Sequence, residues 1–578
     1  MQKSQNNSST GKGKATGRQV HVLLLILALF SVAMLGLATV AIASSSASEA
    51  IPQPPLELPS TAGEAGISVS GATVSADDAA MWIVAGRPDA VTAKIASRFG
   101  ATVLTEGSGI YRVQRAQAKP MAARLQKTGR LIYAEPDVQA VKSGYPDDLY
   151  QGDEWWLNRI VNPTDTTPPE VTEFSPELAL IEESVDPLHP DLTNARLAGA
   201  LSLSPEKDWH GTAIAAIAGS PGEGLGIRGV WPGMKMRLVP MGTTCTTASQ
   251  AVVEAVKAGS AVLNMSYGFP SGSCFTHFVA TEFAVQKGVL PVAAAGNTFA
   301  DGGNASMRPA TDPHVLSVSA VDGNSDVAPF ATQNGGVDIT APGVQIFAPT
   351  ITTAETSDGT SAGSVIKRGW GLISGTSFST PMVSAAATWL LQARPDLDAR
   401  QVGRALTSSA TDRGAPGRDP QYGEGILNIE AALTVRAPST DPMEPNDDIP
   451  WLDGSLLRKK AAFLFKPGAA KRKSVTATLS RTKDAADVYK VKVPARGKVL
   501  ITGAQYQGDI ELRVLKSKAK SIIKPGRNLI VKSDRPRTKT EGVRVTNLKP
   551  KPQTIYVAVT PSTRTYLEYS RYHLSVFG

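Results

Sequence analysis

Two short motifs of small residues place a serine and a histidine where they could perform nucleophilic catalysis. Ser377 lies in Gly-Thr-Ser-Phe-Ser-Thr-Pro at residues 375–381, ahead of a small apolar run that predicts a buried helix. Backbone N–H groups at such a helix start suit a nucleophile whose attack generates an oxyanion. His210, in Trp-His-Gly-Thr before a second small-residue helix, is the candidate base because imidazole titrates near neutral pH. Alone, the serine motif also fits a helix cap, and the histidine a buried core residue.

Three further motifs follow predicted strands. Ala-Ala-Ala-Gly-Asn at 293–297 ends one buried strand, Asn-Met-Ser-Tyr-Gly at 264–268 ends another, and Ala-Pro-Gly at 341–343 follows a third. Together with the serine and histidine motifs, their types, order and spacing resemble those of the subtilisin-like serine proteases (subtilases). The resemblance covers residues 145–435.

The resemblance implies hydrolysis of peptide bonds in polypeptide substrates. It implies that the Asn297 side chain and the Ser377 backbone N–H stabilise the oxyanion. It also assigns two substrate-binding segments, a strand that pairs with extended substrate and the lining of the pocket for the residue before the scissile bond. These segments are, in turn, Ser266, Tyr267 and Gly268, and Ala294, Ala295 and Gly296.

The carboxylate of the constellation departs from the family pattern of Asp, then Thr or Ser, then Gly. The sequence reads Leu-Ile-Glu-Glu-Ser at 180–184, and His-Pro-Asp-Leu at 189–192 fixes the register, so Glu182 stands at the catalytic aspartate position. Glutamate keeps the charge but adds about 1.5 Å of reach, and an error near 1 Å can cost about a hundredfold in rate. On this reasoning, restoring aspartate at position 182 should speed the reaction. Ser184 replaces a glycine and would be strained if its φ were positive.

The chain is long enough for several domains, with 578 residues of which 42% are hydrophobic and 19% charged. Short apolar runs alternate with amphipathic helices over residues 144–436. This alternation predicts an α/β fold, a doubly wound parallel sheet with its site at the carboxyl ends of the strands. The predicted strands are 178–181, 236–239, 261–264, 290–293 and 315–318, and the predicted helices between them include 248–258 and 281–287.

Residues 79–143 predict a small α+β unit with the order β-α-β-β-α-β, a ferredoxin-like split βαβ sandwich. Its ending, Tyr-Ala-Glu-Pro-Asp at 133–137, resembles the inhibitory propeptide of subtilases. The resemblance implies a zymogen whose own propeptide assists folding, inhibits the enzyme and is cut off between about residues 142 and 146. An independent small domain is the alternative.

The N-terminal residues 1–48 predict an export segment. Four basic residues and no acid occur in the first twenty positions, and an apolar run follows at Val22–Ala43. The run is long enough to span a bilayer, so a cleaved signal peptide and a retained membrane anchor both stay open. Everything after it, beginning with a linker at 49–78, is expected outside the cytoplasm, either secreted or anchored.

The C-terminal region begins with a polar, Pro-rich linker at 437–452. Period-two stretches over 453–578 then predict an antiparallel β-sandwich. Glu444-Pro-Asn together with Asp484 and Asp487 resembles the pre-peptidase C-terminal domain of secreted proteases. Residues 441–578 carry 28 Lys and Arg against 12 Asp and Glu, which suggests contact with an anionic cell-surface polymer, the alternative being a well-solvated surface. No nucleic-acid partner is expected.

The two cysteines and the possible metal ligands give only weak indications about structure and function. Cys245 and Cys274 can form one disulfide in an oxidising compartment or remain free thiols. No cofactor is required, and calcium is a possible structural ion. Asp191 is a weak calcium candidate by resemblance, because the loop at 222–226 lacks the usual asparagine.

Two functions from different classes remain. The first is an exported serine endopeptidase in which Ser377 attacks, His210 moves the proton, Glu182 orients the histidine and Asn297 stabilises the oxyanion. The second is a catalytically impaired pseudoprotease that binds peptides or cell-wall polymer, because the carboxylate motif is degraded. An esterase or peptide ligase on the same fold is a third, weaker alternative.

Overall fold

The computed structural model describes strands at 68–69 and 72–73 and, with gaps, residues 80–578. The gaps are 106, 138–140, 143–144, 147–153, 163–165, 201–204, 223–225, 271, 305–306, 356–363, 439, 456–459, 482, 524, 536–539 and 565–568. The predicted export segment at 1–48 lies outside the described residues, as does most of the linker at 49–78. Within the described residues, no helix has the length and apolar character needed to cross a membrane.

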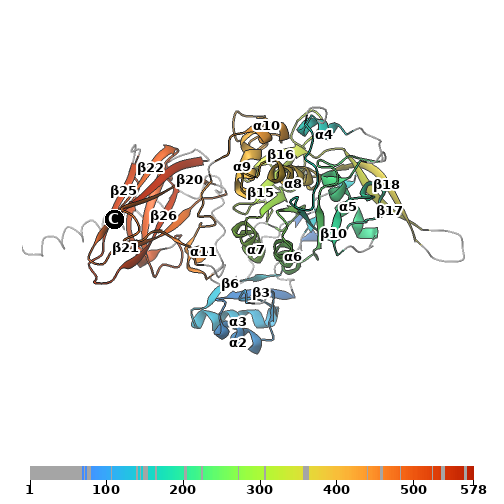
Figure 1. Cartoon of the computed structure of the whole chain (residues 1–578). Coiled ribbons are helices and arrows are strands. Elements are labelled where there is room, and N and C mark those ends of the chain that lie inside the picture. Colours follow the sequence, from blue (N-terminus) through green and yellow to red (C-terminus); the bar gives the residue numbers. More distant parts are fainter. Residues whose placement is uncertain are drawn as a thin grey trace, which may run out of the picture. The chain divides into compact units, whose positions relative to one another are not determined.

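A seven-stranded sheet forms the centre of the largest region (Figure 1). Its order is β10-β11-β9-β12-β14-β15-β16, and every pairing is parallel, as predicted. The strands are β9 (Leu178–Glu182), β10 (Leu197–Gly199), β11 (Met236–Pro240), β12 (Val262–Met265), β14 (Leu290–Ala294), β15 (Leu316–Val321) and β16 (Ile339–Pro342).

Helices cover both faces of this sheet, which explains why its strands are continuous apolar runs. Along β9, Leu178 and Leu180 pack in one core with the side chains of α5 (Pro205–Gly219) and α8 (Thr376–Ala393). The alternate residues Ala179 and Ile181 pack in a second core with α6 (Cys245–Ala258) and α7 (Phe275–Gln286). Smaller elements complete this region: α4 (Trp155–Ile160), α9 (Ala399–Ser408), α10 (Ile429–Thr434), η2 (Pro190–Leu192) and η3 (Phe299–Asp301).

Two features of this region differ from the prediction. Helix α7 begins at Phe275 and not near 281, because its first turns are buried against the sheet although Phe, Thr, His and Val are weak helix formers. A long antiparallel hairpin, β17 (Ile346–Glu355) and β18 (Ser364–Ser374), precedes α8 and was not predicted.

The N-terminal unit has the predicted element order. An antiparallel sheet in the order β4-β5-β3-β6 packs with two helices. The elements are β3 (Met81–Gly86), α2 (Ala90–Arg98), β4 (Thr102–Val103), β5 (Ile110–Gln114), α3 (Arg115–Lys127) and β6 (Leu131–Pro136). Helix α3 starts five residues before the predicted position, with Pro120 inside it.

The C-terminal region forms two sheets around one apolar core, the predicted sandwich. All pairings are antiparallel except that between β19 and β21. One sheet holds β19 (Phe463–Phe465), β21 (Asp487–Val493), β26 (Gln553–Pro561), β23 (Ile510–Lys516) and β24 (Leu529–Ser533). The other holds β20 (Arg472–Ser480), β27 (Tyr569–Phe577), β22 (Lys498–Gln507) and β25 (Thr540–Thr546), and η4 (Gly526–Asn528) precedes β24.

The segment predicted as a polar linker is largely buried. It contains a short helix, α11 (Ile449–Asp453), and its Trp451 ring lies 5.2 Å from the ring of Phe278 on α7. Asn446 and Asp447 are fully buried. This segment therefore packs against the α/β region and does not act as a solvated spacer.

Candidate active site

The serine motif forms the start of α8, and a proline shapes it. Ser377 is the second residue of the helix and is fully buried. Pro381 has no N–H to donate to the Ser377 carbonyl one turn earlier. Ser266 Oγ donates to that carbonyl instead, at 2.9 Å, and itself accepts from Asn264 Nδ2 at 3.0 Å. The end of β12 and the serine helix are therefore joined by a buried hydrogen-bond chain.

The histidine and the unusual glutamate meet. His210 Nδ1 lies 2.9 Å from Glu182 Oε2, and both side chains are buried. Glu182 is the last residue of β9, opposite Pro240 of β11, so the sheet fixes its backbone. Gly211 lets α5 approach closely, because a Cβ there would lie 2.1 Å from the Ser184 carbonyl oxygen. The carboxylate thus holds one imidazole nitrogen in a defined orientation.

Ser184 is not strained. Its φ is not positive, so replacement of the family's glycine imposes no left-handed backbone. Its buried hydroxyl, however, has no hydrogen-bond partner in the part of the chain that the structure describes. Such a group typically costs about 1–3 kcal/mol. The departure from the family motif at this position affects hydrogen bonding and leaves the turn unstrained.

The serine hydroxyl and the histidine are neighbours without a mutual hydrogen bond. The His210 ring lies 5.7 Å from the Phe378 ring, which follows Ser377. Ser377 Oγ donates to the Ser266 carbonyl at 3.1 Å. His210 Nε2 is buried and has no hydrogen-bond partner among the described residues. Catalytic hydrogen bonds are often long or misaligned when substrate is absent.

The Asn297 amide is held from behind by the serine helix. Its Oδ1 accepts from Thr376 N at 3.0 Å and from Thr376 Oγ1 at 2.8 Å. With the oxygen engaged there, the NH₂ group is the part of the amide left to face away from the helix. Asn297 follows Ala294, Ala295 and Gly296, which the sequence assigned to the substrate pocket and which lie at the carboxyl end of β14.

The segment before the α/β region pairs with the predicted substrate strand. Tyr267 and Gly268 form β13, which pairs antiparallel with β7 (Val141–Lys142): Tyr267 lies opposite Lys142 and Gly268 opposite Val141. A few residues later β8 (Tyr145–Pro146) pairs with the end of β18. The strand expected to bind extended substrate therefore binds the chain's own residues.

Two carboxylates of the N-terminal unit cap two helices, a role that sequence reasoning missed. Glu135 accepts from the backbone N–H groups of Phe275 and Thr276 at the start of α7. Asp137 accepts from Thr246 N at 2.9 Å at the start of α6. Helix starts attract negative charge. The available signal was the spacing of two acids in Glu-Pro-Asp.

The cysteines join the same two helix starts. Cys245 is the first residue of α6 and Cys274 precedes α7, and the structure contains a disulfide between them with a Cα–Cα distance of 5.6 Å. Burial raises the pKa of Glu135, whereas the donors on α7 oppose that rise. The disulfide therefore joins the two helix starts that the N-terminal unit contacts through Glu135 and Asp137.

Asp191 is held by protein donors. It accepts from Trp370 Nε1 at 2.8 Å and from the backbone N–H of Ile227. A Cβ on Gly226 would lie 1.6 Å from its Oδ1, so the backbone packs directly against the carboxylate. Burial raises its pKa to about 6. Trp370, from the unpredicted hairpin, occupies one side of the weak calcium candidate.

The candidate site lies at the carboxyl ends of a parallel sheet. It combines a serine at a helix start, a histidine paired with a carboxylate, and an amide donor, the arrangement typical of α/β serine hydrolases. The Subtilase family model matches residues 177–425. Subtilisin DY of Bacillus licheniformis is 30% identical over 265 residues, which cover 44% of this chain and 90% of that protein. The chain belongs to the subtilase family.

A second subtilisin and one solved structure are also similar to this chain. Subtilisin E of Bacillus subtilis (strain 168) is 28% identical over 345 residues, 57% of this chain and 84% of that protein. The solved structure of fervidolysin from Fervidobacterium pennivorans, described as a keratinolytic enzyme related to subtilisin, aligns with a TM-score of 0.51. It has 18% identity and covers 80% of this chain and 84% of that one, a likeness of fold. Membership supports a serine peptidase, and subtilases act on polypeptides.

Proposed function

We propose that this protein is an exported serine endopeptidase, made as a zymogen, whose triad is Ser377, His210 and Glu182. The observation that carries the proposal is the 2.9 Å contact between His210 Nδ1 and Glu182 Oε2. A glutamate that already reaches the imidazole can do the work of the missing aspartate. The carboxylate keeps the proton on Nδ1, which leaves Nε2 free of a proton and able to accept one from the serine. It also stabilises the imidazolium that forms.

The reaction begins when the Ser377 hydroxyl leaves the Ser266 carbonyl and turns to His210 Nε2. His210 accepts the proton as Ser377 Oγ attacks the substrate carbonyl carbon, and it later gives the proton to the leaving amine. The Asn297 NH₂ and the Ser377 backbone N–H donate to the oxyanion. Water then attacks the acyl carbon while His210 accepts its proton, and His210 passes that proton to Ser377 Oγ as the acyl group leaves.

The first substrate is the chain itself, and the register of β7 on β13 supports a specific bond. Tyr267 lies opposite Lys142, and Ser266, the preceding residue of the substrate strand, is one step closer to the serine helix. Ser266 is the residue whose carbonyl accepts from Ser377 Oγ. We therefore propose that self-cleavage cuts the bond between residues 143 and 144, which lie outside the described residues and inside the expected range of 142–146.

The alternative is a pseudoprotease that binds peptides. It is favoured by the hydrogen bond from Ser377 Oγ to the Ser266 carbonyl and by His210 Nε2, for which the described residues offer no hydrogen-bond partner. An enzyme locked in that arrangement would not react. In either case the export segment would carry the protein out of the cytoplasm, secreted or anchored at Val22–Ala43. The basic C-terminal region would then contact anionic cell-surface polymer.

Labelling with a fluorophosphonate probe, read by intact mass, separates the two functions. The enzyme should add one probe per chain and release a fragment ending at residue 143, and Ser377→Ala should abolish both. A parent protein that is unlabelled and uncut, identical to Ser377→Ala, would establish the pseudoprotease. Cleavage at a different bond would leave the enzyme standing and refute the assigned position.

A further inference from the structure

Three lysine side chains of the C-terminal region converge on one aromatic ring. Phe463 begins β19, a strand at the edge of its sheet, and lies opposite Lys490 of β21. The Nζ atoms of Lys490, Lys466 and Lys492 lie 4.6, 5.2 and 5.7 Å from the centre of the Phe463 ring. A further lysine, Lys460, comes shortly before the ring in the sequence, and its charge acts on Lys490. We call these five residues the Phe463 patch.

The alternation of side chains along β21 sets the patch on the outer face of the sandwich. Val491 and Val493 pack in the core between the two sheets, so Lys490 and Lys492 lie on the opposite face of the strand. Lys490 is 8% exposed, and its Nζ donates to the Ala461 carbonyl at 3.0 Å. The other members of the patch are exposed or half-buried. One lysine is therefore held firmly against the sheet, while the rest reach solvent.

The ring gathers these ammonium groups but does not neutralise them. An aromatic face attracts a cation through its quadrupole and carries no net charge. Burial, and after it the like charge of Lys460, lowers the pKa of Lys490; Lys466 acts in the same direction, whereas Asp453 opposes them. Among the described residues, no carboxylate lies within ion-pair distance of the patch lysines. The patch thus concentrates positive charge that lacks a close counter-charge in the described part of the chain.

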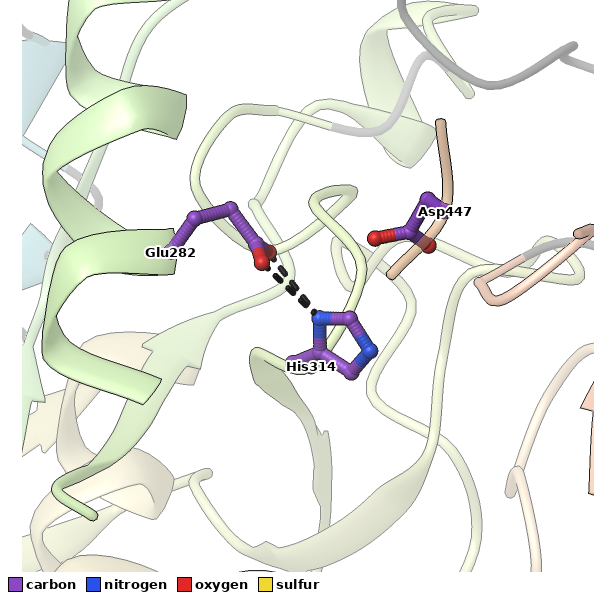
Figure 2. Close-up of side chains that lie close together, drawn as sticks. All are labelled: Glu282, His314 and Asp447. Carbon is purple, nitrogen blue, oxygen red and sulfur yellow. Dashed lines mark hydrogen bonds and ion pairs between the residues drawn. The ribbon is translucent and has the colours of Figure 1, made fainter. Parts of the chain in front are cut away.

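Acidic residues of the C-terminal region are engaged at other places. Figure 2 shows the Asp447 carboxylate beside Glu282 and His314 of the subtilase domain, where it is fully buried. Glu511 forms an ion pair with Lys532 on the neighbouring strand. These carboxylates leave the charge of the Phe463 patch to be balanced from solution.

We propose that the Phe463 patch binds a linear phosphodiester polymer, such as a polyol phosphate chain. The inference rests on the proposed contact between the basic C-terminal region and an anionic cell-surface polymer, and it assigns that contact to particular residues. Lys490 and Lys492 are two residues apart on one face of a strand, so their Cα atoms are separated by about 6.6 Å. A polymer with closely repeated charges can contact both of them and the exposed lysines at the rim, which strengthens binding through several linked contacts.

The side chains of the patch favour phosphate over carboxylate. The planar guanidinium fork of arginine matches a carboxylate, whereas the ammonium group of lysine is a point charge that suits phosphate. The patch contains four ammonium groups and no guanidinium. Its half-buried Phe463 ring adds an apolar surface for the carbon spacers between successive phosphates.

The test uses the full chain carrying Ser377→Ala, so that no self-cleavage intervenes. Fluorescence anisotropy measures binding of labelled synthetic poly(glycerol phosphate) over a series of NaCl concentrations. Lys466→Gln combined with Lys492→Gln should weaken binding about tenfold or more and flatten its dependence on salt, because fewer counterions are released. The control combines Lys498→Gln with Arg544→Gln, which removes the same charge from the outer face of the other sheet. Its affinity should stay within about twofold of the parent.

A second variant separates this site from the general charge of the region. Phe463→Leu keeps every lysine but removes the ring that gathers them, so binding of the polymer should fall about threefold or more. Parental affinity in this variant would overturn the assignment of the site to the ring. Thermal unfolding confirms that each variant is folded, and Lys460→Gln combined with Lys466→Gln replaces the first double variant if it is not.

Three other results would overturn the proposal. The absence of binding would refute both the patch and the wider contact with anionic polymer. An equal loss of affinity in the two double variants would leave a diffuse basic surface standing and refute the patch. Binding of poly-L-glutamate or of glycerol 1-phosphate as tight as that of poly(glycerol phosphate) would refute the polymer chemistry. Every protein in the test lacks the Ser377 hydroxyl, so the outcome is independent of the proposed peptidase activity.

Discussion

Shortening Glu182 to aspartate should slow the enzyme, although aspartate is the residue that the family uses. The glutamate carboxylate already lies at hydrogen-bond distance, 2.9 Å from His210 Nδ1. Its backbone is the last paired position of β9, opposite Pro240, and cannot advance toward α5 without disturbing the sheet. Aspartate would therefore withdraw the carboxylate. The expectation from sequence, that Glu182→Asp speeds the reaction, is reversed by this geometry.

The magnitude follows from one methylene group. Removing it withdraws the carboxylate by about 1.5 Å, to roughly 4.4 Å from Nδ1, which is beyond hydrogen-bond distance. A displacement near 1 Å can cost about a hundredfold, or about 2.7 kcal/mol in the barrier. In subtilisin, loss of the aspartate costs about 3 × 10⁴ in kcat, which sets an upper bound. Glu182→Asp should fall between these limits. Glu182→Gln should lose about 10⁴, because the amide favours the wrong tautomer.

The assay is kcat/KM of matured protein on a chromogenic peptide, with self-cleavage time courses as a second readout. Glu183→Asp is the matched control, the same shortening at the neighbouring, partly exposed glutamate, and it should stay within about twofold of the parent. A Glu182→Asp enzyme as fast as the parent, or faster, would refute the reasoning. It would mean that the β9 end moves to close the gap.

Three further predictions concern the contacts around the site. Ser266→Ala should lower the unfolding free energy by about 1–3 kcal/mol in thermal melts, because the buried Ser377 carbonyl loses the hydrogen bond that Ser266 Oγ donates to it; an unchanged melting temperature would contradict this. Glu135→Gln should shorten the delay between self-cleavage and activity by about tenfold or more, since charge-assisted bonds to α7 are weakened; an unchanged delay would show that these bonds do not retain the propeptide. Asp191, with its pKa raised to about 6, stabilises the fold at low pH and loses that contribution as pH rises through the folded-state value. Asp191→Asn should therefore reduce the fall in stability between about pH 4 and pH 6, and an equal fall in both proteins would count against it.

The parallel sheet was predictable because its central strands β9, β12 and β14 are buried on both faces. A run such as Leu178–Ile181 has no polar alternation, and the structure divides its side chains between two cores. The N-terminal unit and the sandwich were predictable from element order and from period-two stretches. Helix starts were less so, since burial overrides weak propensity in the first turns of α7.

Much of the candidate site depends on contacts between distant residues, which patterns cannot supply. The motif at 375–381 identified the serine, but not that Pro381 leaves a carbonyl for Ser266 to satisfy. The register of the motif at 180–192 identified Glu182, but only the structure shows its reach to His210. The polar composition of the segment around Asp447 predicted a solvated linker, whereas its carboxylates are buried together with Glu282 and His314, more than 130 residues earlier in the sequence.

The extra methylene of Glu182 and the position of α5 belong together. Gly211 carries no side chain, and the Ser184 carbonyl oxygen occupies the space that a Cβ there would need, so α5 and the segment after β9 are already in contact. Packing next to the histidine therefore fixes the distance between the backbone at the end of β9 and the backbone of α5. The side chain at position 182 must span the gap from its own backbone to the His210 imidazole. Glutamate spans it with a 2.9 Å hydrogen bond. Because glutamate reaches the imidazole at hydrogen-bond distance from this backbone position, we expect the carboxylate to orient His210 as the proposed triad requires.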